Sequence, residues 1–332
     1  MKLSWMKMIA SFFLAGVLTA PAWAAATAVP GTVNYVEGQV AIGDQFLDAH
    51  SVGATTLQPG QELVTDNGKA EILLTPGVFL RVDSQSAVQM VAGSLTNTEI
   101  NVEQGRAMVE VAEIHPQNDL RITEEGVTTR LVKKGLYDFD AAQNQVRVFS
   151  GKAILMDGDR EVHIDGGRMV DLNTSAKLKA RSFDKDAYEQ SDLYRWSSLR
   201  SQYLAQANAE TARTYVVDGA YGPGWFGGGW YWSPWFGAYT FIPADGIFYS
   251  PFGWGFYSPF VVFRSPFFFG GGHPFVHRFG PEFHGPVALG RPGFGRGFRT
   301  APVPHGRVTV NRGPSMRFGG GGFHGGSHIG RR

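Results

Sequence analysis

The sequence predicts an all-β domain followed by one helix and a tail of biased composition. Residues 33–172 consist of short runs that alternate apolar and polar side chains, separated by Gly, Asn, Asp or Pro. Alternation with a period of two is typical of strands. Residues 182–213 contain neither Gly nor Pro, whereas Gly, Pro and aromatic residues dominate from residue 214 onward. We therefore expect an antiparallel sandwich or roll of short strands, one amphipathic α-helix and a largely disordered tail.

Nine segments of the first region are expected to be strands. They favour β-branched and aromatic residues, and turn signals recur about every 8 to 12 residues, as in all-β folds. Gly151 and Gly158 suit tight hairpin turns, because glycine adopts the positive φ that such turns require. The expected strands are 38–43, 69–74, 78–82, 98–102, 106–111, 136–140, 145–150, 152–157 and 160–164.

The helix is expected over residues 182–213. Its apolar side chains fall on one stripe, and Ser182 or Asp184 can cap its start. We expect this stripe to pack on the β domain, although a free-standing helix that binds a partner is an alternative. The stripe consists of Leu193, Trp196, Leu199, Tyr203 and Ala207.

The first 24 residues have the pattern of a secretory signal peptide. Lys2 and Lys7 precede an apolar stretch over 8–18, and Ala22-Trp23-Ala24 offers the small residues that a signal peptidase requires. We expect cleavage after Ala24, which leaves no membrane span, and export to the periplasm or surface of a Gram-negative-type bacterium. The alternative is an uncleaved anchor, because residues 8–28 are nearly free of charge and long enough to span a bilayer.

Composition excludes several kinds of site. The chain has no cysteine, so disulfides, thiolate metal sites and cysteine nucleophiles are absent. Its net charge of +1 conceals an acidic part and a basic tail. Residues 25–213 carry 18 Lys and Arg against 26 Asp and Glu, whereas residues 214–332 carry ten Arg against three acidic residues. This asymmetry indicates a folded acidic domain and a cationic segment.

The tail divides into an aromatic Gly/Pro-rich segment, 214–269, and a Gly/Arg/His-rich segment, 270–332. Together they hold 28 of the 44 glycines and 29 of the 44 aromatic residues. Neither has the aliphatic periodicity that builds a core, and such composition marks low complexity. We expect the second segment to be disordered. The first is expected to form at most a loose aromatic layer, with its rings kept outside a core.

No motif in the chain predicts catalysis, a cofactor or a specific metal site. The "GFGRG" stretch at 293–297 neither follows a strand nor opens a helix, so it does not predict a phosphate loop. The His273/His277 and His324/His328 pairs have helical spacing, but Pro274 and the glycines at 325–326 forbid a helix there. Signatures of hydrolases, zincins and P-loop enzymes are missing. We therefore expect a protein that is not an enzyme.

The β region resembles a known family in five consecutive stretches. These are "LQPGQELVTDNGKAEILL" (57–74), "PGVFLRVDSQSAV" (76–88), "INVEQGRAMVEV" (100–111), "VKKGLYDFD" (132–140) and "VRVFSGKAIL" (146–155). Together they resemble the FecR domain, the periplasmic module of bacterial iron-uptake signal transducers. The resemblance covers about 33–172 and implies a FecR-like β domain. Leu136 replaces the family's usual threonine, and the sigma-factor contact of the family is not carried over to this chain.

The aromatic and arginine residues of the tail form the candidate contact surface. Arginine binds phosphate in a bidentate manner, and aromatic faces stack on sugars or settle at membrane interfaces. We expect the tail to tether a FecR-like recognition or signalling module to an envelope protein, polysaccharide or anionic lipid, and not to nucleic acid. Alternatives are an inert spacer, docking of the aromatic layer on the β domain, a matrix protein that self-associates through its tail, and a carbohydrate-active enzyme. The candidate residues are Trp230, Tyr231, Trp232, Trp235, Phe236, Tyr239, Arg264, Arg278, Arg291, Arg296 and Arg299.

Overall fold

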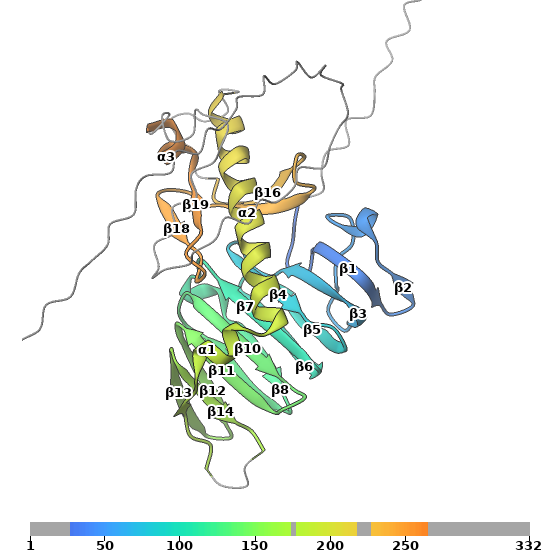
Figure 1. The fold of residues 1–332 in the computed structure, drawn as a ribbon, viewed down its shortest axis with the longest axis vertical. Helices are drawn as coiled ribbons and strands as arrows, with labels where there is room; N and C mark the ends of the chain where they lie inside the picture. Colours follow the sequence, from blue (N-terminus) through green and yellow to red (C-terminus); the bar gives the residue numbers. More distant parts are fainter. Residues whose placement is uncertain (1–26, 174–176, 218–226, 265–332) are drawn as a thin grey trace, which may run out of the picture. The chain divides into compact units, whose positions relative to one another are not determined.

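A computed structural model describes residues 27–173, 177–217 and 227–264 (Figure 1). The predicted signal peptide and the Gly/Arg/His-rich segment lie outside the described residues. The prediction of a mostly β protein with one long helix is confirmed.

Most strands join one large sheet of 15 strands. Every pairing in it is antiparallel except that of β6 with β8, which is parallel. The strands are β1 (Val33–Ile42), β2 (Gln45–Phe46), β3 (Glu62–Leu73), β4 (Val78–Val82), β5 (Ser86–Ser94), β6 (Asn97–Gln104), β7 (Arg106–Val111), β8 (Leu120–Glu124), β9 (Val127–Leu131), β10 (Gly135–Asp140), β11 (Gln145–Ser150), β12 (Lys152–Asp157), β13 (Arg160–Asp165), β14 (Arg168–Asp171) and β15 (Arg181–Ser182).

The sheet surrounds a single aliphatic core. Its strand order is β13-β12-β9-β8-β6-β5-β3-β4-β7-β10-β11-β14-β15. Strands β5 and β4 pair with the first and last parts of β3, β1 pairs with the opposite edge of β3, and β2 pairs with β1. Val33 of β1 and Ile164 of β13 belong to the same buried cluster, although their strands stand far apart in this order. The sheet therefore rolls over its own inner face, as the alternating pattern predicts.

The central strands are buried on both faces. In β4 the side chains of Val78, Leu80 and Val82 enter the main core, and the alternate positions Phe79 and Arg81 are equally inaccessible to solvent. Strand β10 is also buried along its whole length. A second layer must therefore cover the outer face of these strands.

Part of that layer is the long helix α2 (Asp192–Val217), which follows the short α1 (Lys185–Glu189). Asp184 caps α1 by accepting backbone hydrogen bonds, so the predicted cap serves the short helix. The α2 face that packs inward contains Ser197, Arg200, Ser201 and Asn208 besides apolar residues. The predicted stripe is wrong at Leu199, which is exposed.

The rest of the layer comes from the aromatic segment, where two hairpins and a short helix form. They are β16 (Gly229–Ser233) with β17 (Ala238–Ile242), β18 (Ile247–Tyr249) with β19 (Gly255–Tyr257), and α3 (Pro259–Arg264). Two short 3-10 helices, Ala49–Ser51 and Pro116–Asn118, complete the described elements. All five residues of β17 are buried. The expectation that this segment cannot contribute to a core is therefore wrong for residues 229–264.

Candidate binding pocket

The aromatic hairpins and α2 form a second hydrophobic core on the outer face of the sheet. Leu73 and Phe79 project from the sheet, Leu204 projects from α2, and Phe241 and Phe256 project from the hairpins, all into one cluster. The Phe79 ring lies 5.0 Å from Trp230 and 6.1 Å from Phe256, centroid to centroid. Figure 1 shows α2 (yellow) running from the sheet to the hairpins (orange). The hairpins are thus integral to the folded body.

Buried charges also tie α2 to the sheet. The Arg81 guanidinium contacts Glu71 at 2.9 Å and also pairs with Glu110, and the three side chains are fully buried. Arg200 of α2 approaches Glu71 at 2.9 Å, and Ser201 donates to Glu110 at 2.8 Å. Burial opposes ionisation of Glu71, but the charges of Arg200 and Arg81 outweigh it and lower the pKa of Glu71. Both carboxylates therefore serve the architecture.

Two asparagine side chains hold the hairpins through backbone groups. Asn34 of β1 accepts the N–H of Tyr239 at 2.7 Å and donates to its C=O at 3.0 Å. Asn208 of α2 accepts the N–H of Tyr257 at 2.7 Å and donates to the carbonyls of Phe241 and Tyr257. Each carboxamide pairs with backbone as a neighbouring strand does. The hairpins are thereby fixed in position as well as packed.

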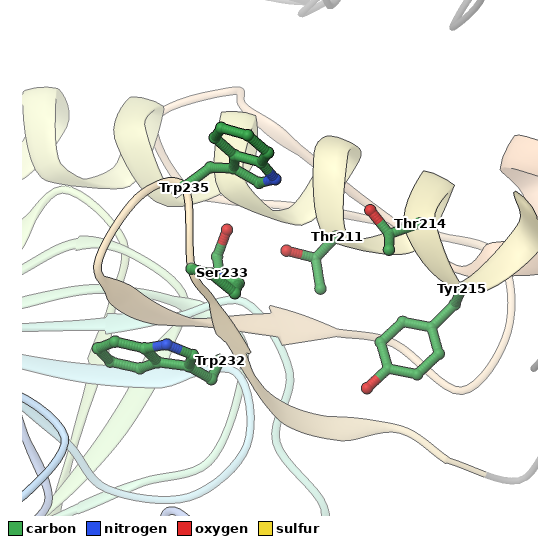
Figure 2. Close-up of a pocket in the computed structure, with 7 residues that line it drawn as sticks. Thr211, Thr214, Tyr215, Trp232, Ser233 and Trp235 are labelled. Carbon is green, nitrogen blue, oxygen red and sulfur yellow. The ribbon is translucent and has the colours of Figure 1, made fainter. Parts of the chain in front are cut away.

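A pocket of about 310 Å³ opens between the C-terminal end of α2 and the β16–β17 turn. Figure 2 shows Trp235 and Tyr215 at opposite ends, with hydroxyl groups between them. Burial raises the pKa of the Tyr215 phenol, so this group stays neutral. None of the lining residues carries a charge. They are Thr211, Thr214, Tyr215, Trp232, Ser233, Pro234 and Trp235.

The turn that carries Trp235 is held in one conformation. The backbone N–H groups of Phe236 and Gly237 both donate to the carbonyl of Ser233, at 3.1 and 2.8 Å. Gly237 has φ +57°, which glycine adopts without strain. The Tyr203 hydroxyl donates to the carbonyl of Phe236 at 2.7 Å, and the two rings meet edge to face at 4.9 Å. Trp235 itself is 84 % exposed.

The structure brings only part of the predicted contact surface together. Trp232 and Trp235 line the pocket, and Tyr231 adjoins it through its ring contact with Tyr215 at 5.1 Å. Tyr239 is buried in the second core, and Trp230 packs against that core.

The remaining predicted contact residues lie away from the pocket lining. Phe236 packs on Tyr203, and Arg264 stacks over Phe260 at 4.2 Å. The other predicted contacts, Arg278, Arg291, Arg296 and Arg299, lie outside the described residues.

Sequence reasoning missed the helical side of the pocket. Thr211, Thr214 and Tyr215 have i, i+3, i+4 spacing, which places them on one helix face. The predicted helix ended at residue 213, whereas α2 continues to Val217. The signal available in the sequence was that the helical spacing of the residues on this face continues for one more turn past residue 213.

Other kinds of site find little support in the part of the chain that the structure covers. Among the described residues, no group of three or more His, Asp or Glu side chains is arranged to hold a metal ion. Within the same residues, no helix has both the length and the apolar character to cross a bilayer. The neutral pocket between α2 and the β16–β17 turn offers a ligand both aromatic faces and hydroxyl groups.

Comparison with known proteins identifies the β region. Residues 61–154 match the family described as FecR protein, which confirms the predicted FecR-like domain. No curated protein matches the chain.

Two similar solved structures are of a "putative anti-sigma factor" from Parabacteroides distasonis. They share 12 % and 15 % sequence identity with TM-scores of 0.33 and 0.32, and each match covers 39 % of this chain. The matched region spans 63 % of those chains.

Proposed function

We propose that this chain is a non-enzymatic recognition module of the bacterial envelope that takes part in signal transduction. The supporting observation is the FecR match over residues 61–154, in a body that joins this domain to α2 through buried charges and to the hairpins through the Asn34 side chain. A ligand that contacts the hairpins therefore binds the same folded body as the one that contains the FecR-type sheet.

The arginine tail is proposed to tether this module to envelope polyanions. Arg278, Arg291, Arg296 and Arg299 follow the described residues in the sequence, and residues 283–332 contain no acidic residue. Guanidinium groups bind phosphate and carboxylate through paired N–H donors. Export by the predicted signal peptide would place the chain beside lipid phosphates and acidic polysaccharide.

A gene-deletion strain tests the module and the tether together. The strain is complemented with the wild-type chain, with a variant in which the four arginines become glutamine, and with a charge-preserving lysine variant. We expect wild type and the lysine variant to sediment with envelope membranes at about 0.1 M salt and to be released at about 1 M, because salt screens exposed charges. The glutamine variant should remain soluble. Transcript profiles should show a defined gene set that changes on deletion and is restored by wild type.

Two outcomes contradict the proposal in different ways. Retention of the wild type at high salt would support a self-associating matrix protein, because contacts between aromatic rings persist when charges are screened. An unchanged transcript profile after deletion would refute the signalling role while leaving the tether unaffected.

A further inference from the structure

We infer that the pocket between α2 and the β16–β17 turn binds uncharged faces of hexopyranose sugars. This inference deepens the proposed recognition function by naming a ligand class for the pocket. The site is formed by Trp235 and Tyr215 at its ends, with Trp232, Pro234 and three residues that bear aliphatic hydroxyl groups completing the lining.

The exposure of Trp235 is the first argument. Among the described tryptophans it alone is exposed, whereas Trp196, Trp230, Trp232 and Trp254 are at least partly buried. The turn beneath it is fixed by the Phe236 and Gly237 hydrogen bonds and by Tyr203. A tryptophan side chain has only two rotatable torsions, so stacking a ligand on a ring carried by a fixed turn costs little conformational entropy. This position therefore favours a ligand with a flat apolar face.

The polar groups of the lining specify a hydroxylated ligand. The Thr214 hydroxyl donates to the carbonyl of Glu210 at 3.1 Å, and the Thr211 hydroxyl donates to that of Ala207 at 2.7 Å. Each hydroxyl oxygen thus keeps lone pairs that can accept from a sugar O–H. A sugar ring combines an apolar C–H face with a rim of hydroxyl groups. The pocket is complementary to it, because aromatic rings lie at the ends of the pocket and hydroxyl groups lie between them.

Charge and size exclude other ligand classes. The lining contains no Lys or Arg to bind phosphate and no carboxylate to bind a cation. Its volume of about 310 Å³ lies at the lower end of the range for small-molecule sites, roughly 300–1,000 Å³. A site of this size suits a small ligand such as one or two sugar rings.

Titration of the full-length chain with glycans tests the inference. The probes are a printed array of bacterial polysaccharides and the soluble oligomers maltohexaose, cellohexaose and chitohexaose, with intrinsic tryptophan fluorescence as the readout. Trp235→Ala should weaken the binding of the best probe by about tenfold or more, because a stacked ring contributes that much. Trp235→Phe should retain part of the affinity. Thr214→Val should weaken binding while it keeps the side-chain shape.

A matched control is Phe46→Ala, because Phe46 is 80 % exposed on β2 and is absent from the pocket lining. It should bind glycan as wild type does, and each variant should keep the wild-type Tm. The inference is wrong if no glycan binds or if Trp235→Ala binds as tightly as wild type. Because Trp235→Ala retains the arginine tail, it should still sediment with membranes, so failure of the sugar site is distinguishable from failure of the tether.

Discussion

Glu124 at the end of β8 is a carboxyl group without a partner. Its side chain is 1 % exposed, and neither oxygen accepts a hydrogen bond. Burial raises the pKa of Glu124 to about 8, and the charges of Asp140 and Asp138 add to the effect. The folded protein therefore keeps a proton that the unfolded chain releases near the usual pKa of 4.5. Folding stability must fall as pH rises between these two values and level off above the higher one.

Replacement of Glu124 by glutamine should remove this dependence. We expect Glu124→Gln to be more stable than wild type at pH 8 by on the order of 2–4 kcal/mol, because an amide needs no proton to stay neutral. Near pH 4 the two proteins should be equally stable. Urea denaturation at both pH values measures the difference, and the exposed neighbour provides the control Glu125→Gln. Equal advantages at both pH values would contradict the argument.

At the scale of elements, the hairpins depend on two side chains that replace a neighbouring strand. Asn34 comes from the sheet and holds Tyr239, whereas Asn208 comes from the helix and holds Tyr257. Both carboxamides are fully buried. A buried N–H that loses its acceptor is left unsatisfied, which costs about 1–3 kcal/mol.

Alanine at either asparagine should therefore loosen one hairpin selectively. In hydrogen exchange, Asn34→Ala should speed exchange of the Tyr239 amide and leave the Tyr257 amide protected. Asn208→Ala should have the reverse effect, so that each variant controls for the other. Exchange that accelerates equally at both amides in either variant would show that the hairpins open as one unit and would refute separate anchoring.

Strands such as β4 and β7 were predictable from the sequence because their inner faces are continuously aliphatic, whereas β5, β8, β9 and β14 were not among the nine expected strands. Val78, Leu80 and Val82 mark β4 by alternation alone, whereas the alternate Arg81 reads as a solvent-facing residue. Its burial depends on Glu71 in the paired strand β3, and on Glu110 and the covering helix, which are more distant in the chain. A buried pair of this kind, formed by charged residues from different elements, produces no recognisable pattern in the local sequence. For the same reason the polar inward face of α2 could not be predicted.

The pocket was predictable only on its aromatic side. Trp232 and Trp235 stand out by composition, but composition does not separate an exposed ring from a buried one such as Tyr239. That distinction arises from position in the hairpin, because Trp235 lies in the turn between β16 and β17, whereas Tyr239 lies in β17, whose five residues are all buried. The Thr214 side of the pocket depends on where the helix ends, and helix boundaries are poorly defined by sequence.

For the whole molecule, the described residues on both sides of residue 211 form one cooperative body. A chain ending at Thr211 would cut α2 and remove both hairpins, exposing Leu73 and Phe79 of the sheet. We expect a lower Tm and increased binding of a hydrophobic dye for this truncation, because buried apolar surface becomes exposed. A chain ending at Arg264 keeps every described contact and should retain a Tm close to that of the full chain. Equal Tm values for the two truncations would contradict a joint core.

The bond between Asn34 and Tyr239 spans 205 positions of the chain. During synthesis, β1 leaves the ribosome long before Tyr239 has been made. Until the hairpins are added, the outer face of the sheet is exposed to solvent, with Glu71 and Arg81 hydrated and Phe79 uncovered. Formation of a contact between segments so far apart in the chain is intrinsically slow, because the entropy of closing the loop is lost before the contact stabilises it. Nascent chains consequently pass through a partly folded, aggregation-prone intermediate. A chaperone that binds this intermediate would raise the yield of native protein.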